Sequence, residues 1–171
     1  MVEFTYQMVL STLQTVALIV GIAYYLFIMR NSQRTQETTL KNRQAQLLMQ
    51  MWNRTQSKEF TRDLNTMGEM EWEDYDDFMK KYNYPSEEAD AWVSVGNFCE
   101  GLGVMVKNDL IEPSLVDDLE SHTIVGFWEK FSPIIFETRK RYNFPSLFEQ
   151  WEYLYNQVAP IYYQQHPELK T

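Results

Sequence analysis

The residues best suited to chemistry are the carboxylates of one dense acidic run. They are Glu69, Glu71, Glu73, Asp74, Asp76 and Asp77. Carboxylate oxygens are the ligands that Ca²⁺ and Mg²⁺ prefer. An EF-hand loop needs glycine at its sixth position, but the sixth residue counted from Asp74 is Met79, so the run does not match a calcium loop. A Mg²⁺ site built on Asp74 and Asp76 stays open.

Apolar residues within and just after the same run are spaced as on one face of a surface helix. Trp72, Tyr75, Phe78 and Met79 recur at helical intervals. Such a stripe predicts that these four side chains are buried and that the carboxylates form a solvated face. We prefer this interpretation to a metal site.

The remaining reactive side chains are isolated from one another. His122 and His166 are the only histidines, and neither has a partner at a spacing typical of metal ligands. Cys99 is the single cysteine, so it cannot form an intrachain disulfide, and no base for it is recognisable. The chain contains no GxSxG or HExxH motif. The sequence therefore predicts no catalytic residue, no metal ligand and no cofactor.

Small residues recur on one face of a predicted helix. Ala89, Gly96 and Gly103 are spaced by seven residues. Glycine inside a helix costs about 1 kcal/mol relative to alanine, so the spacing predicts that another helix packs closely there. A phosphate-binding loop is the competing interpretation, but no strand precedes the glycines and neither GxGxxG nor GK[ST] is present.

Helices must position all of these side chains, because no stretch alternates in the way of a strand. The first element is an uncharged segment of 26 residues, from Phe4 to Met29. As a helix it measures about 39 Å, enough to cross a hydrocarbon core of about 30 Å. The flanks do not fit a signal peptide, and the all-round apolar surface of its second half does not fit a core helix. We predict a single transmembrane helix, and an interfacial helix stays open.

Polar residues follow one face of this predicted span. They are Gln7, Ser11, Gln14 and Thr15. In lipid, such a stripe prefers a neighbouring protein helix to acyl chains, so these residues are candidates for contact with a partner helix. The alternative is that the first of them lie in the headgroup zone.

Basic residues follow the apolar segment. Between Arg30 and Lys58, six basic residues stand against Glu37 alone, and the candidates for contact with an anionic leaflet are Arg30, Arg34, Lys41 and Arg43. Because positive charge stays in the cytoplasm, we expect a single pass through the cell membrane, with the N-terminus outside and the helical domain in the cytoplasm. The net charge is −9. With the basic cluster beside the membrane, this charge argues against nucleic-acid binding.

The expected fold is all-α, with one transmembrane helix followed by a bundle of about five to seven helices. We divide the chain into residues 1–30 with the span, a basic amphipathic stalk over 31–57, and an acidic helical domain over 58–171. Ser57 and Ser86 are expected helix caps. Further helices are expected over Pro113 to Glu120 and His122 to Tyr142, the second kinked or split at Pro133, and then after a capping box at Ser146 and Glu149.

Three segments carry a family resemblance, strongest between Trp92 and Val158. They read GLGVMVKNDLI, SLVDDL and GFWEKFSPIIFETRKRYNFPSLFEQWEYL. They resemble a bacterial and archaeal family of small membrane-tethered helical proteins that carry a domain of unknown function. The matching positions are Gly103, Val106, Leu110, Ile111, Trp128, Pro133, Arg139, Phe148, Glu149 and Leu154. The resemblance implies one N-terminal membrane helix followed by a helical domain, and it assigns no catalytic residue.

Two functions are consistent with these features. The first is a membrane-anchored interaction protein without catalytic activity, serving as an accessory subunit of a membrane complex or associating with itself. Its 26 aromatic residues favour this function, because aromatic side chains are enriched in protein interfaces. The second is a metal-dependent, membrane-tethered enzyme with an acidic site around Glu71 to Asp77. No small-molecule substrate can be identified.

Overall fold

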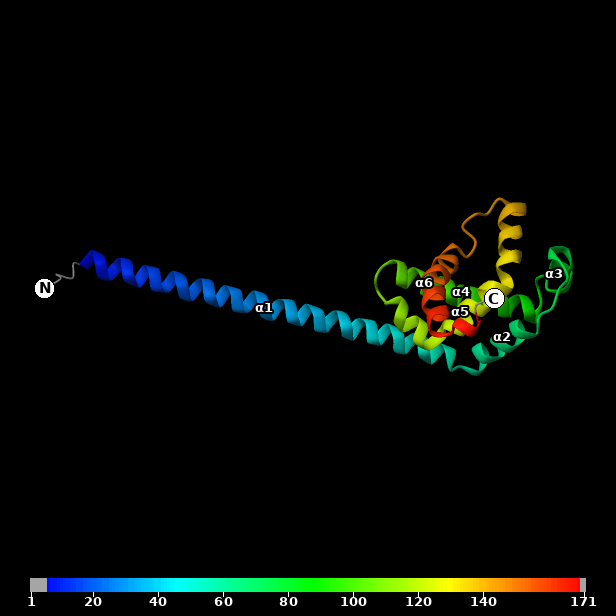
Figure 1. Ribbon diagram of the computed structural model, residues 1–171, viewed down its shortest axis with the longest axis horizontal. Coiled ribbons are helices and arrows are strands. Elements are labelled where there is room, and N and C mark those ends of the chain that lie inside the picture. The colour runs from blue at the N-terminus through cyan, green and yellow to red at the C-terminus, as the bar shows by residue number, and fades with distance from the viewer. Residues whose placement is uncertain (1–5, 170–171) are drawn as a thin grey trace. The chain divides into compact units, whose positions relative to one another are not determined.

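The computed structural model describes residues 6–169, and within that range the chain is helical and contains no strand. Six α-helices and one short 3₁₀ helix follow in order (Figure 1): α1 Tyr6–Thr55, α2 Lys58–Glu69, α3 Tyr75–Lys81, α4 Glu87–Lys107, α5 Pro113–Tyr142, α6 Glu149–Gln165 and η1 Pro167–Leu169. The prediction of an all-α fold with a long apolar N-terminal helix is confirmed.

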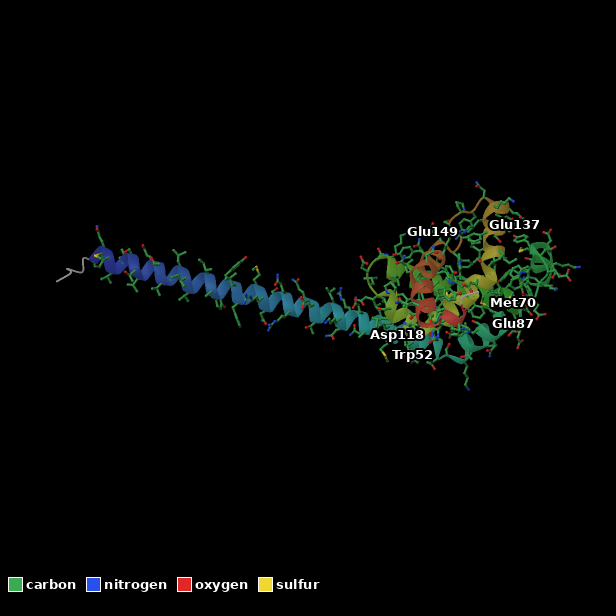
Figure 2. All side chains as sticks on the ribbon, viewed as in Figure 1. Trp52, Met70, Glu87, Asp118, Glu137 and Glu149 are labelled. Atoms are coloured by element: carbon green, nitrogen blue, oxygen red, sulfur yellow. The ribbon has the colours of Figure 1, made fainter. Side chains whose placement is uncertain are left out.

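Contacts divide the chain into two compact units, Met1–Ala45 and Gln46–Thr171. In the first, the described residues all belong to α1, and nearly all their side chains are exposed. Figure 2 shows these side chains projecting on both sides of the helix in that view. The described part of this unit therefore has no hydrophobic core of its own.

The core of the second unit lies where α4, α5 and α6 pack together, with α2 against α4. Val95, Cys99, Leu102 and Val106 form the buried stripe of α4, as their spacing predicts. From α6, Trp151, Leu154 and Val158 are completely buried. Interdigitation of these stripes removes most of the large apolar side chains from water, which is the main source of the unit's stability.

Side-chain caps set the starts of three helices. The Ser57 hydroxyl accepts a hydrogen bond from the Phe60 N–H at 3.1 Å, and Ser86 does the same for Ala89 at 3.1 Å. Asp74 caps α3 by accepting from the Asp77 N–H at 2.9 Å. The predicted caps at Ser57 and Ser86 are confirmed, since each accepts an N–H that has no partner inside its own helix.

Between Pro113 and Tyr142 the structure has one helix where the sequence predicts two. Pro113 is its first residue, as predicted, and no residue between Glu120 and His122 interrupts it. Pro133 lies inside α5 and does not split it. In Figure 1 the gold turns at the end of α5 run in a different direction from the yellow turns before them. A proline removes one backbone hydrogen bond and bends a helix, and the neighbouring turns hold it together.

The predicted capping box at Ser146 and Glu149 is wrong. Phe148 is the cap residue of α6, with a left-handed φ of 52°, and its side chain makes no capping hydrogen bond. The helix then continues through Pro160 to Gln165. The Glu100 carboxylate from α4 replaces the missing local cap.

Candidate functional site

The N-terminal part of α1 is long and apolar enough to cross a membrane by length and composition, and none of its apolar stretch is buried. Phe4 and Thr5, the first residues of the predicted span, lie outside the described residues, as does Glu3. From Val16 to Met29 no side chain is charged. The structure thus presents a continuous helix whose apolar surface is covered by no element among residues 6–169.

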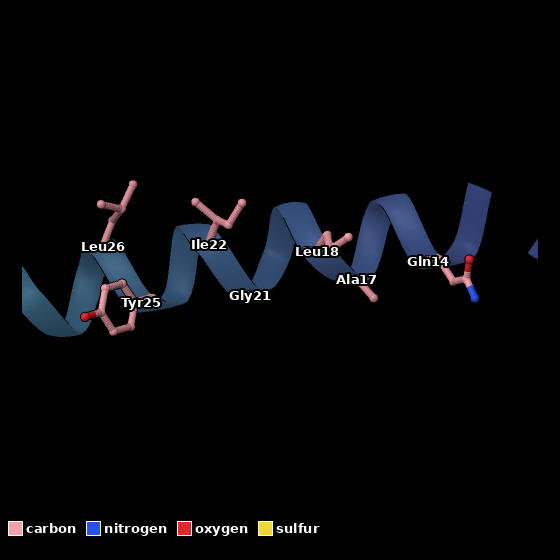
Figure 3. Close-up of a pocket in the computed structure, with 7 residues that line it drawn as sticks. All are labelled: Gln14, Ala17, Leu18, Gly21, Ile22, Tyr25 and Leu26. Atoms are coloured by element: carbon pink, nitrogen blue, oxygen red, sulfur yellow. The ribbon is translucent and has the colours of Figure 1, made fainter. Parts of the chain in front are cut away.

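A shallow groove runs along one face of this apolar stretch (Figure 3). Its floor is formed by Ala17 and Gly21, and a Cβ added to Gly21 would meet no atom within 4 Å. Gln14 and Tyr25 line its two ends. The groove exists because the two small side chains follow each other at a spacing of four, which places them on one face of the helix.

The predicted polar stripe runs into this groove. Gln14 lines it, and Gln7 lies two turns before Gln14 on the same face. The Ser11 hydroxyl donates to the Met8 carbonyl at 3.0 Å, and the Thr15 hydroxyl donates to the Ser11 carbonyl at 2.9 Å. These two hydroxyls are satisfied inside the helix. The amides of Gln7 and Gln14 are therefore the side chains of the stripe that would gain most from a partner in lipid, and Gln14 is the one that lines the groove.

The basic residues that follow the apolar stretch are all exposed. Within residues 6–169, none of Arg30, Arg34, Lys41 and Arg43 forms a salt bridge. The hydroxyls of Thr35, Thr38 and Thr39 donate to carbonyls one turn earlier. The positive charge of this segment is available to an external anionic group.

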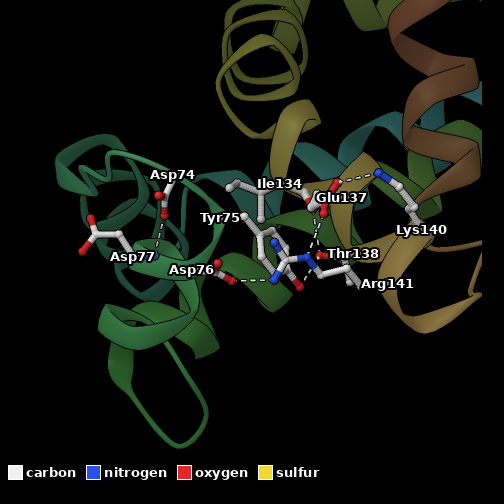
Figure 4. Close-up of polar contacts among 9 residues, drawn as sticks. All are labelled: Asp74, Tyr75, Asp76, Asp77, Ile134, Glu137, Thr138, Lys140 and Arg141. Atoms are coloured by element: carbon white, nitrogen blue, oxygen red, sulfur yellow. Dashed lines mark hydrogen bonds and ion pairs between the residues drawn. The ribbon is translucent and has the colours of Figure 1, made fainter.

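The acidic run is engaged in local structure. Asp74 caps α3, Asp77 pairs with Lys81 at 2.7 Å, and Asp76 pairs with Arg141 of α5. Figure 4 shows Asp76 turned toward Arg141 and Asp77 turned away from it. The hydrogen bond from Lys81 lowers the pKa of the Asp77 carboxyl below its ordinary value. Among the described residues, no three His, Cys, Asp or Glu side chains are grouped so that they could hold a metal ion.

Neither the histidines nor the cysteine join a cluster. His122 is exposed, and the Nδ1 atom of His166 lies 3.5 Å from Glu168. Cys99 is completely buried in α4, and burial raises the pKa of its thiol well above the ordinary value. Because the thiolate is the reactive form, this cysteine is inert in the folded protein.

Two glycines of α4 lie in close contact with the start of α6. A Cβ on Gly103 would lie 2.0 Å from the Gln150 carbonyl oxygen, and one on Gly96 would lie 2.6 Å from the Phe148 ring. Ala89, the third small residue of the series, is buried near the start of α4. Only glycine leaves room for the α6 backbone at position 103.

Glu100 of α4 caps α6 from outside that helix. Its Oε2 atom accepts from the Gln150 N–H at 3.0 Å and from the Trp151 N–H at 2.9 Å. Partial burial raises the pKa of the Glu100 carboxyl, and the two backbone bonds oppose this shift. A negative charge at the positive end of the α6 dipole is favourable, which explains why α6 needs no local cap.

Comparison with known proteins identifies the family. Residues 11–158 match the model of a domain of unknown function, DUF4760. The chain belongs to this family. Searches of curated proteins and of solved structures each returned no match. The DUF4760 match begins inside the apolar part of α1 and ends inside α6, so the family model covers most of the candidate span and most of the helical unit.

Arg139 is one of the positions on which the resemblance to a domain of unknown function rests. In this DUF4760 chain its Nε atom donates to the Leu147 carbonyl at 2.9 Å, and its guanidinium pairs with Glu152. These bonds attach the end of α5 and the following loop to α6. Gly103, Phe148 and Leu154 contribute to the contact of α6 with its neighbours, so these positions are structural.

Sequence reasoning missed two kinds of candidate residue. Ala17 and Gly21 form a small-xxx-small pattern, which is typical of helix contacts in membranes and could have been recognised from the sequence. Glu129 is different, because its partners Tyr155 and Tyr163 lie 26 and 34 residues away. No local spacing could have related these three residues.

Proposed function

We propose that this chain is a membrane-anchored helical protein without catalytic activity of its own, and an accessory subunit of a larger membrane protein complex. The observation that carries the proposal is the uncovered groove over Ala17 and Gly21, with the Gln14 amide at one end. A partner helix seated there would approach the α1 backbone closely and bring a hydrogen-bonding group to Gln14.

The physical reason is that lipid and leucine are equally apolar, so burial of apolar area does not drive helix association in a membrane. Close packing over small residues and interhelical hydrogen bonds drive it instead. Ala17, Gly21 and Gln14 supply both of these on one face. A lone anchor would need only an apolar surface of sufficient length.

The proposed location is a cell membrane crossed once, with the N-terminus outside and the helical unit in the cytoplasm. Arg30, Arg34, Lys41 and Arg43 support this orientation, because cytoplasmic flanks are rich in Lys and Arg. Their exposed side chains would contact anionic headgroups of the inner leaflet.

A pull-down tests the subunit role. The full chain is purified in mild detergent, and stoichiometric partners are identified by mass spectrometry. Gly21→Leu fills the groove and should release the partner. Ala23→Leu adds a similar volume on the opposite face of α1 and should retain it. Retention of the partner by Gly21→Leu, or the absence of any stoichiometric partner from wild-type preparations, would contradict the proposal.

Orientation is tested with a cysteine at Asn31. Because Cys99 is buried, background labelling of the folded protein is small. A membrane-impermeant thiol reagent should leave Asn31→Cys unlabelled in intact cells and label it after the cells are opened. Labelling of intact cells would reverse the proposed orientation.

The metal-dependent enzyme has less support, because Asp74, Asp76 and Asp77 already have partners within the chain. Tight binding of a divalent cation that disappears in the double variant Asp74→Asn, Asp76→Asn would favour it. We expect no such binding.

A further inference from the structure

A carboxylate held by two tyrosines lies on the surface of the helical unit. The Tyr155 hydroxyl donates to the Glu129 Oε1 atom at 3.0 Å, and the Tyr163 hydroxyl donates to the same oxygen. Glu129 belongs to α5, and both tyrosines belong to α6. Glu129 itself is exposed, whereas the tyrosines are half-buried. Two hydrogen bonds thus hold a solvent-facing carboxylate in one position.

The carboxylate has no cationic partner within the part of the chain that the structure describes. No lysine, arginine or histidine among residues 6–169 forms a salt bridge with Glu129. The hydrogen bond to Glu129 raises the pKa of the Tyr163 phenol to about 12. An ordered charge without a counter-ion differs from the carboxylates of Asp76 and Asp77, which both have one.

Aromatic rings and a groove adjoin this charge. A groove of ≈ 520 Å³ is lined by Tyr155, Asn156, Ala159, Pro160, Tyr163 and Gln164. Its volume lies within the range of about 300–1,000 Å³ that is usual for ligand sites. Tyr155 is backed by Trp128, with ring centroids 6.0 Å apart and an angle of 29° between the planes. The Tyr155 ring is therefore held in place by the core.

We propose that this groove receives a basic side chain, arginine or lysine, from a partner polypeptide. A carboxylate favours a cation, and the flanking tyrosine faces add cation–π attraction. The two hydroxyls place the carboxylate before the partner arrives, so little side-chain freedom is lost on binding. The inference is independent of the membrane groove, because all of its residues lie within Gln46–Thr171.

The test uses the full chain in nanodiscs of phosphatidylcholine, which carries no net charge and therefore does not compete for a basic probe. The probe is an acetylated and amidated peptide of four arginines, followed through the ring signals of Tyr155 and Tyr163 by NMR. Glu129→Gln removes the charge but keeps an oxygen that accepts from both hydroxyls. It should weaken binding about tenfold, the effect of losing one charge-assisted contact.

Glu69→Gln is the matched control, since Glu69 is also exposed and forms no salt bridge within residues 6–169. It removes the same charge from the same unit and should change the affinity less than about twofold, because distant surface charges are screened. Equal losses in the two variants would show diffuse attraction to an acidic surface and overturn the proposal. Unchanged tyrosine signals in the wild-type protein would also overturn it. Neither result bears on the Gly21→Leu pull-down.

Discussion

Gly103→Ala should destabilise the helical unit through a single added methyl group. The new Cβ would lie 2.0 Å from the Gln150 carbonyl oxygen and 2.5 Å from the carbonyl carbon. Both atoms belong to the backbone of α6, so no side-chain rotation can relieve the clash. To reach an ordinary separation above 3.4 Å, the first turn of α6 must move by more than 1 Å.

Two costs follow from that movement. Overpacking in a well-packed interior costs about 1–3 kcal/mol. Displacing Gln150 and Trp151 also weakens their bonds to Glu100, and a lost helix cap costs about 1 kcal/mol. The better helix propensity of alanine offsets about 1 kcal/mol of this loss in stability. We therefore expect a net loss of about 1–3 kcal/mol in the free energy of unfolding.

Gly101→Ala provides the control on the same helix. A Cβ at Gly101 would meet no atom within 4 Å, so only the propensity gain of up to about 1 kcal/mol remains. Urea unfolding of the full chain in mild detergent, followed by tryptophan fluorescence, measures both variants. Equal stability of the two variants would refute the conclusion that Gly103 makes room for the α6 backbone.

Three further outcomes are expected. Arg139→Lys should lower the free energy of unfolding by about 1–2 kcal/mol in the same assay, because lysine cannot make both bonds of the guanidinium. A wild-type midpoint would contradict that role. The folded state raises the pKa of Tyr163 above its ordinary value of 10.0, to about 12. Its bond to Glu129 is therefore fully present below the ordinary value and is lost as pH rises through the folded value. NMR titration of the Tyr163 ring should show this pKa, and Glu129→Gln should return it toward 10.0; an unchanged pKa in the variant would mean that the Glu129 carboxylate does not cause the shift. Cys99 should resist thiol reagents at neutral pH until denaturant is added, and rapid labelling of the native protein would contradict its burial.

Local signals explain how far the sequence predicts this fold. Ser57 and Ser86 were recognisable because a cap and its N–H partner lie within three residues of each other. The apolar stripe of α4 was readable for a similar reason, since its period is that of a single helix. The spacing of Gly96 and Gly103 pointed to close packing without naming the partner helix.

Tertiary contacts explain where the sequence prediction fails. The pattern from Ser146 to Glu149 predicts a capping box, but Glu100, about fifty residues earlier in the chain, supplies the cap. The sequence predicts two helices, separated after Glu120, with a kink or a split at Pro133 in the second, because only local signals can be read from it. Packing along α5 holds one continuous helix together. The negative charge of the acidic run is evident from the sequence, but the pairing of Asp76 with Arg141 is evident only from the fold.

The capping of α6 by Glu100 also has a consequence for synthesis. A chain leaves the ribosome from its N-terminus, so α4 and its carboxylate emerge before residues 149–165. The last helix can then begin on an acceptor that is already present, at a register set by its neighbour. A nascent chain released before residue 149 would leave the Glu100 carboxylate without its two donors and would expose the apolar face of α4 that α6 covers. Quality-control proteases should remove such a fragment faster than the finished protein.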